Sequence, residues 1–141
     1  ALREVTLEQL KSAQHKIDPV LFKRARHVIS ENDRAITTFK ALKKNDITTI
    51  SMAMQESHIS LRDDFEVTTK EMDGLVDIIS SVLGSAGGVR MTGGGFGGCV
   101  VALVPTTMVD QVKDAVNSRY EQEFFLKPSL YLCTATQGAF R

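Results

Sequence analysis

Glycine is concentrated in one short stretch of this 141-residue sequence. Eight of the ten glycines lie between Gly84 and Gly98, in a segment that ends at Cys99 and is written Gly-Ser-Ala-Gly-Gly-Val-Arg-Met-Thr-Gly-Gly-Gly-Phe-Gly-Gly-Cys. Glycine loses the most backbone entropy on folding, so such a cluster is typical of a loop that needs positive φ or approaches another group closely. Its closely spaced N–H groups suit a phosphate or another phosphate-binding loop.

The residues around this loop exclude two familiar nucleotide-binding motifs. Gly93, Gly95 and Gly98 have G-x-G-x-x-G spacing, but the dinucleotide fingerprint needs a strand before the glycines and a helix after them. Here the apolar run Cys99–Val104 follows, closed by Pro105, and it predicts a buried strand. A P-loop would need a lysine after its last glycine, and none follows. Two interpretations of the loop therefore remain open: it binds an anion, or it forms a close-packed corner between a helix and a strand without a ligand.

A second polar cluster consists of His58, Arg62, Asp63 and Asp64. A guanidinium matches phosphate oxygens and carboxylates suit magnesium, so a place in an active site is one interpretation. The other is that Arg62 and the two aspartates end a helix, cap the next element and pair with one another. From residue chemistry alone we favour the second. His27, in a basic stretch of a predicted helix, is expected on a solvated face without a function.

Two segments of the sequence resemble the galactokinases, a family within the GHMP kinases. Residues 89–99 are similar to the third glycine-rich motif of that superfamily and are written Val-Arg-Met-Thr-Gly-Gly-Gly-Phe-Gly-Gly-Cys. Residues 56–67 are similar to a galactokinase motif and are written Glu-Ser-His-Ile-Ser-Leu-Arg-Asp-Asp-Phe-Glu-Val. Because both motifs occur in the right order and spacing, the resemblance covers essentially residues 1–141, as the C-terminal domain.

The resemblance implies an enzyme that transfers the γ-phosphoryl group of ATP to the 1-hydroxyl of galactose, with magnesium, in the cytoplasm. It implies that the loop glycines project into the active-site cleft: Gly93, Gly94, Gly95, Gly97 and Gly98. Arg62 and Thr92 are expected at the border of that site. Phe96 is expected to anchor the loop by packing rather than to stack on adenine.

The N-terminal signatures of galactokinases are absent from this sequence. It contains neither a Gly-Glu-His-Thr-Asp sugar signature nor a Pro-x-x-x-Gly-Leu-Ser-Ser-Ser phosphate loop, and the catalytic aspartate that follows them has no counterpart. No catalytic or metal-binding residue can therefore be carried onto this chain. ATP, Mg²⁺ and galactose are expected to bind mainly to the missing N-terminal domain, and the chain alone should be inactive. A kinase for N-acetylgalactosamine and a non-catalytic sugar-sensing or anion-binding module are the alternatives.

The composition argues against several other classes of protein. Seventeen basic residues balance seventeen acidic ones at a pI near 7.1, which gives no electrostatic footprint for nucleic acid or an anionic membrane. The length predicts one domain, and no signal peptide or transmembrane run is visible. Cys99 and Cys133 lack zinc spacing, so we expect two small buried side chains in a reduced cytosol.

The elements that position the loop are helical in the first half of the chain. Caps and apolar periodicity predict helices at about residues 6–13, 19–43, 46–61, 69–83 and 109–120. The second and third of these should form an antiparallel hairpin. The long helix is expected to bury one apolar stripe: Leu21, Val28, Ile29, Ala35, Ile36, Phe39 and Leu42.

Strands are predicted in the second half of the chain. They cover residues 88–92, 99–104 and 130–133, the last followed by residues 134–138. This order implies the α+β class, with helices packed on one face of a mainly antiparallel sheet. The resemblance adds a ferredoxin-like core with an extra N-terminal helical hairpin.

Overall fold

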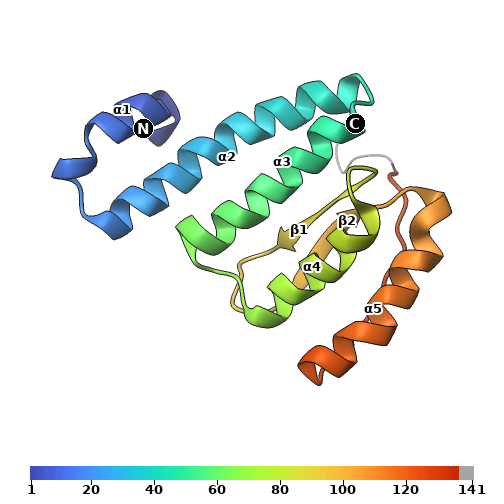
Figure 1. Cartoon of the computed structure of the whole chain (residues 1–141). Coiled ribbons are helices and arrows are strands. Elements are labelled where there is room, and N and C mark those ends of the chain that lie inside the picture. The colour runs from blue at the N-terminus through green and yellow to red at the C-terminus, as the bar shows by residue number, and fades with distance from the viewer. Residues whose placement is uncertain (137–141) are drawn as a thin grey trace.

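Helices dominate the structure and a small sheet lies among them (Figure 1). The computed structural model describes residues 1–136. The helices are α1 (Leu7–Ser12), α2 (Pro19–Lys43), α3 (Ile47–Ser60), α4 (Lys70–Leu83) and α5 (Val109–Phe124). Single 3-10 turns cover Leu2–Glu4, Gln14–Lys16 and Thr106–Met108, and a π-helical segment, η3 (Leu61–Phe65), extends α3. Strands β1 (Gly88–Thr92) and β2 (Cys99–Leu103) pair antiparallel, so the α+β class is confirmed.

The helix ends follow the capping signals of the sequence. The Thr6 hydroxyl accepts from the Gln9 amide while the Gln9 side chain accepts from the Thr6 amide, which is a capping box. Asp18 caps α2, with proline at its first helical position. Asn45 then takes a left-handed φ of 53° and Asp46 caps α3. The expected antiparallel hairpin of α2 and α3 is therefore present (Figure 1).

The sheet packs against α4 and α5 on one face. Val89 of β1 is buried in a cluster with residues of both helices: Val76, Ile78, Ile79, Leu83, Val112, Val116 and Tyr120. Met91, two residues further, is 1% exposed and packs against Leu61, Val67 and Met72. Helix α3 runs beside β1, where a Cβ on Gly88 would lie 2.7 Å from the Met54 sulfur. The strand that leads into the glycine loop is thus enclosed by α3 and α4.

The predicted apolar stripe of α2 is only partly buried. Ile29 lies in the core, but four stripe members are 55–63% exposed: Leu21, Ile36, Phe39 and Leu42. Phe22, His27 and Ala41 are buried instead. The reason is that α2 carries apolar residues on more than one face, and contact with α1, α3 and η3 decides which face is covered. Among residues 1–136 neither this helix nor any other has the length and apolarity needed to cross a bilayer.

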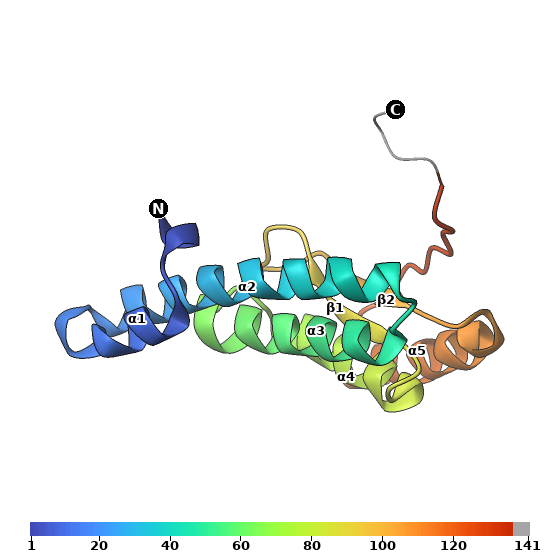
Figure 2. The same cartoon turned by 90° about the horizontal axis from the view of Figure 1, so that it is seen from above.

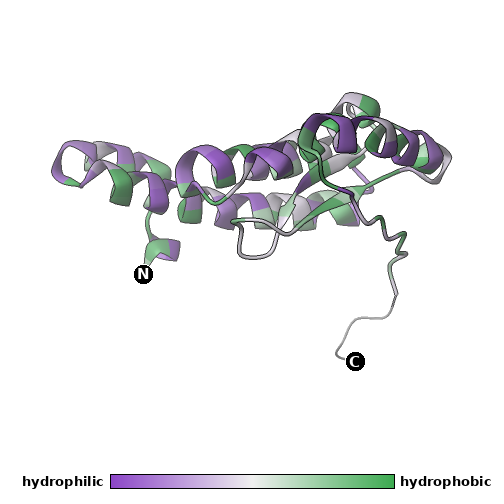
Figure 3. Ribbon diagram, turned by 90° about the horizontal axis from the view of Figure 1, so that it is seen from below, coloured by the Kyte–Doolittle hydropathy of each residue, from purple (hydrophilic) through white to green (hydrophobic). Residues whose placement is uncertain are grey.

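The predicted strand at residues 130–133 is wrong. The described chain after α5 has no regular structure, and Figure 3 shows hydrophobic residues along it in green. Tyr131 and Leu132 are 86% and 68% exposed. A strand needs a backbone partner, and no described strand pairs with these residues. Of the segment predicted to follow, residues 137 and 138 lie outside the described part of the chain.

Both cysteines are free and exposed, so the expectation that they are buried is also wrong. Cys99 opens β2 on the face turned away from α4 and α5, opposite the exposed Thr92 in the strand register. Cys133 lies in the unpaired chain that follows α5. Burial of small thiols is a statistical tendency that depends on the elements around them, and no helix or strand in the described part of the chain covers either position.

Candidate functional site

The glycine-rich loop joins the paired ends of β1 and β2, where Thr92 lies opposite Cys99. The loop stands out from the body of the molecule (Figure 2). Four of its glycines have φ between +84° and +118°: Gly93, Gly95, Gly97 and Gly98. Residues that carry a side chain rarely adopt such positive φ values, so the path of the backbone explains why this loop contains so many glycines.

The crest of the loop is attached to the turn that follows η3. The Phe96 amide donates a hydrogen bond of 2.7 Å to the carbonyl oxygen of Val67. At Gly95 a Cβ would lie 2.3 Å from that oxygen and 2.6 Å from the Val67 Cβ. Real Cβ atoms do not approach a carbonyl oxygen so closely. Both the positive φ and the close approach to Val67 therefore require glycine at position 95.

The remaining loop glycines face open space. Among residues 1–136, a Cβ on Gly93, Gly94, Gly97 or Gly98 would meet no atom within 4 Å apart from its neighbours in the chain. Because no side chain crowds these positions, an anion can approach the successive backbone N–H groups of the loop. The loop is therefore fixed at its crest and free along the rest of its length.

Phe96 does not anchor the loop by packing, which corrects that expectation. Its side chain is 77% exposed, and its φ is 60°. The backbone explains the difference, because the amide of Phe96 faces Val67 while the side chain projects away from the core. A bulky apolar residue in a loop suggests an anchor, but here the hydrogen bond does the anchoring.

Thr92 and Arg62, the two expected border residues, have different surroundings. Thr92 is exposed at the end of β1, directly before the loop. Arg62 pairs with its neighbour Asp63, with Nε 2.8 Å from Oδ1. Within residues 1–136 no hydrogen bond or ion pair joins Arg62 to the loop. The structure therefore brings Thr92 to the loop and leaves Arg62 on the surface of η3.

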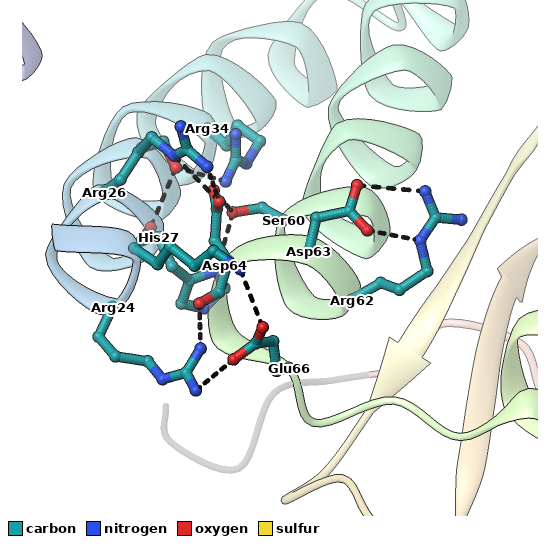
Figure 4. Close-up of polar contacts among 11 residues, drawn as sticks. Arg24, Arg26, His27, Arg34, Ser60, Arg62, Asp63, Asp64 and Glu66 are labelled. Atoms are coloured by element: carbon teal, nitrogen blue, oxygen red, sulfur yellow. Dashed lines mark hydrogen bonds and ion pairs between the residues drawn. The ribbon is translucent and has the colours of Figure 1, made fainter. Parts of the chain in front are cut away.

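Asp64 belongs to a buried network between α2 and η3 (Figure 4). Its carboxylate accepts from the Arg26 guanidinium, with Nε 3.0 Å from Oδ1, and from the Ser60 hydroxyl at 3.1 Å. His27 lies beside Ser60, with Nδ1 3.0 Å from Oγ, and its ring stacks on Phe65 with centroids 4.5 Å apart. The aspartate thus joins two helices, which supports the structural interpretation of this cluster.

His27 is 7% exposed, so its expected place on a solvated face is wrong. Burial lowers the pKa of its imidazole, although the nearby Glu31 carboxylate opposes this shift. Its partner Ser60 lies 33 positions along the chain. Such a contact leaves no signal in the local pattern of α2.

Ion pairs from α2 also fix the turn that carries Val67. Glu66 has a left-handed φ of 58°, and its carboxylate accepts from Lys23 at 2.9 Å and from Arg24 at 2.6 Å. Hydrogen bonds from Lys23 and then Arg24 lower the pKa of the Glu66 carboxyl. The two sequence motifs, residues 56–67 and 89–99, therefore form one unit in space, in which the first supports the loop of the second.

His58, which the sequence groups with Arg62, Asp63 and Asp64 without giving it a role, also belongs to this unit. It is 4% exposed, and its Nδ1 accepts a hydrogen bond of 3.3 Å from the Met91 amide in β1. Its Nε2 lies 3.1 Å from Oδ1 of Asp73 in α4. Burial lowers the pKa of His58, while the Asp73 carboxylate opposes this shift.

The described residues contain no cluster suited to a metal ion. Within residues 1–136, no three His, Cys, Asp or Glu side chains lie close enough to share one. The carboxylates of η3 are engaged with arginines instead.

Comparison with known proteins places these features in context. Residues 38–122 match the family described as GHMP kinases C terminal. Among solved structures, the chain is similar to the galactokinase of Lactococcus lactis, which was crystallised with galactose. The sequence identity is 39% and the TM-score is 0.80, over 86% of this chain and 31% of that galactokinase. The chain thus spans less than one third of the length of this relative.

Proposed function

This chain belongs to the family of GHMP kinase C-terminal domains, and from that membership we propose that it is the C-terminal domain of a cytoplasmic galactokinase. The similarity to the galactokinase of Lactococcus lactis, at 39% identity, supports the choice within the superfamily. The free, exposed cysteines fit a reducing compartment. The remaining two thirds of such an enzyme would lie outside this sequence.

The observation that carries the proposal is the geometry of the glycine loop. Gly95 is fixed against Val67, while the neighbouring glycines leave their backbone N–H groups uncrowded. In phosphoryl transfer the protein need not form a covalent bond itself, but it must place hydrogen-bond donors near the charged phosphate oxygens. We assign the loop the task of shaping the phosphate-binding loop of the N-terminal domain and closing the site over it.

In the proposed reaction the 1-hydroxyl oxygen of galactose bonds to the γ-phosphorus of ATP. The bond between that phosphorus and the bridging oxygen breaks, and ADP leaves. The base that takes the hydroxyl proton, the sugar contacts and the Mg²⁺ ligands belong to the N-terminal domain in this proposal. This chain contributes backbone donors and the shape of the cleft, so it should not catalyse the reaction alone.

The test is sugar-dependent release of ADP, measured with the 141-residue chain and with the intact gene product that contains it. We expect galactose-dependent activity in the intact protein only. Parallel assays with N-acetylgalactosamine distinguish a kinase for that sugar. An intact protein inactive on both sugars would contradict the proposal and favour a sensor. Activity of the chain alone would contradict the assignment of the essential groups to another domain.

A further inference from the structure

The Met91 amide is held by a side chain rather than by the neighbouring strand. In an antiparallel pair, alternate residues turn their N–H groups away from the partner strand. Met91 is such a residue, and its N–H donates to His58 Nδ1 at 3.3 Å in a buried setting. The carbonyl oxygen of Met91 accepts from the Arg90 side chain at 3.0 Å. Side chains thus satisfy both outward backbone groups of Met91, two residues before the glycine loop.

The hydrogen bond from Met91 determines the tautomer of His58. Because Nδ1 accepts, it carries no proton in the neutral ring, so the proton is on Nε2. Nε2 lies 3.1 Å from Oδ1 of Asp73 without hydrogen-bond geometry, and neither atom has a hydrogen-bond partner among the described residues. The other carboxylate oxygen of Asp73 accepts from the Thr68 hydroxyl at 3.2 Å. A chain of contacts therefore runs from the partly exposed Asp73 of α4 through the buried His58 to β1.

The loop is thus attached at two places, and both attachments come from residues 56–67. His58 holds the strand that enters the loop, and Val67 holds its crest. Resting on the proposed function, we propose that His58 is a positioning residue for phosphoryl transfer. It fixes the Met91 peptide and thereby the starting point of the glycine loop, without touching substrate itself. A misplacement of about 1 Å at a positioned group can cost on the order of a hundredfold in rate.

Asparagine and glutamine at position 58 separate this role from simple packing. The amide of asparagine reaches about as far as Nδ1 of histidine, so His58→Asn keeps an acceptor for Met91. The amide of glutamine reaches about as far as Nε2, so His58→Gln keeps a donor for Asp73 and loses that acceptor. Both variants carry a side-chain amide, and they differ in which ring nitrogen of His58 that amide replaces. His27→Ala is the control for loss of a buried imidazole, because His27 contacts Ser60 and Phe65 instead.

The experiment measures kcat and the KM values for ATP and galactose in the intact protein, and hydrogen exchange of the Met91 amide in the 141-residue chain. We expect His58→Gln to lower kcat at least tenfold and to speed Met91 exchange at least tenfold, with little change in KM for galactose. For His58→Asn, both kcat and the rate of Met91 exchange should stay within about threefold of the parent values. His27→Ala should lower stability without this loss of kcat.

Two results would overturn the inference. One is a kcat for His58→Gln that equals or exceeds that of His58→Asn, and the other is Met91 exchange that neither variant changes. An intact parent protein without kinase activity would contradict the proposed function instead, and Met91 exchange would still show whether His58 holds the strand. The two failures are therefore distinguishable.

Discussion

The carbonyl oxygen of Val67 accepts a hydrogen bond from the Phe96 amide at 2.7 Å, and the same oxygen lies 2.3 Å from where a Cβ on Gly95 would be. One atom therefore both anchors the loop and excludes a side chain from it. Because Val67 follows the left-handed Glu66, which Lys23 and Arg24 hold, the position of the loop depends on α2 as well.

Gly95→Ala should destabilise the chain by about 1–3 kcal/mol, since it combines a strained φ with overpacking against backbone. Gly94→Ala is the matched control, because its Cβ would meet no atom of the described chain within 4 Å beyond its chain neighbours, and its φ is not positive. It should change the free energy of unfolding by less than about 0.5 kcal/mol. Urea unfolding of both variants measures this difference, and equal losses would contradict the assigned contact.

Gly95→Val should greatly reduce kcat of the intact kinase and leave the fold largely present, as far-ultraviolet circular dichroism can verify. The reason is that the loop must leave Val67 to accommodate the branched side chain. Gly74→Ala, which alters the contact between α4 and α5, controls for a general loss of stability. Normal kcat in a folded Gly95→Val protein would contradict the role of the loop.

Stability should fall as the pH drops below about 6.5, the ordinary pKa of histidine. Burial lowers the pKa of both His27 and His58 in the folded chain. Between the folded and unfolded pKa values the unfolded chain binds more protons, so acid favours unfolding. Each histidine changes the free energy of unfolding by at most about 1.4 kcal/mol per pH unit.

Urea unfolding at pH 7.5, 6.5 and 5.5 tests this dependence. His58→Asn and His27→Asn should each reduce the slope of stability against pH, because each removes one titrating group. A free energy of unfolding that is constant between pH 7.5 and 5.5 would show that the buried rings are not neutral in the folded chain.

Local features of the fold could be predicted from the sequence because their causes are local. Thr6, Asp18 and Asp46 cap helices through amides two or three residues away. Gly84 ends α4 with a φ of 52°, as a glycine after an apolar stripe predicts. The position of the glycine loop between two strands followed from the apolar run after it. In each case the donor, acceptor or constraint lies within the same segment.

The supports of the loop could not be predicted because they connect distant segments. His58 and Met91 are 33 positions apart, and nothing in either segment specifies their contact. Similarly, α2 has more apolar positions than one face can bury, and the location of η3 decides that His27 is covered while Phe39 is not. The missing third strand has the same cause, since β propensity at residues 130–133 does not supply a partner strand.

Asp63 and Asp64 are adjacent but should differ in their effect on stability. Asp64→Ala should destabilise the chain by about 1–3 kcal/mol, because it leaves the buried Ser60 hydroxyl and the Arg26 guanidinium without their acceptor. Asp63→Ala removes only an exposed pair with Arg62 and should cost no more than about 0.5 kcal/mol. Thermal unfolding of the two variants compares them directly. A larger loss for Asp63→Ala would indicate that the surface pair, rather than the buried network, holds η3.

Gly74 of α4 and Phe124 of α5 should be energetically coupled. A Cβ on Gly74 would lie 1.9 Å from Cζ of Phe124, so Gly74→Ala must displace that ring from Tyr120, with which its centroid distance is 5.1 Å. Overpacking of this kind costs about 1–3 kcal/mol. Alanine in place of a helical glycine returns about 1 kcal/mol, so a net loss is expected in the parent chain.

The sign should reverse when the ring is absent. In a Phe124→Ala background the clash is gone and only the helix propensity remains, so Gly74→Ala should stabilise by about 0.5–1 kcal/mol. Urea unfolding of the parent, both single variants and the double variant forms a complete double-mutant cycle. If Gly74→Ala has the same effect in both backgrounds, the close approach of α4 and α5 is not what requires glycine at position 74.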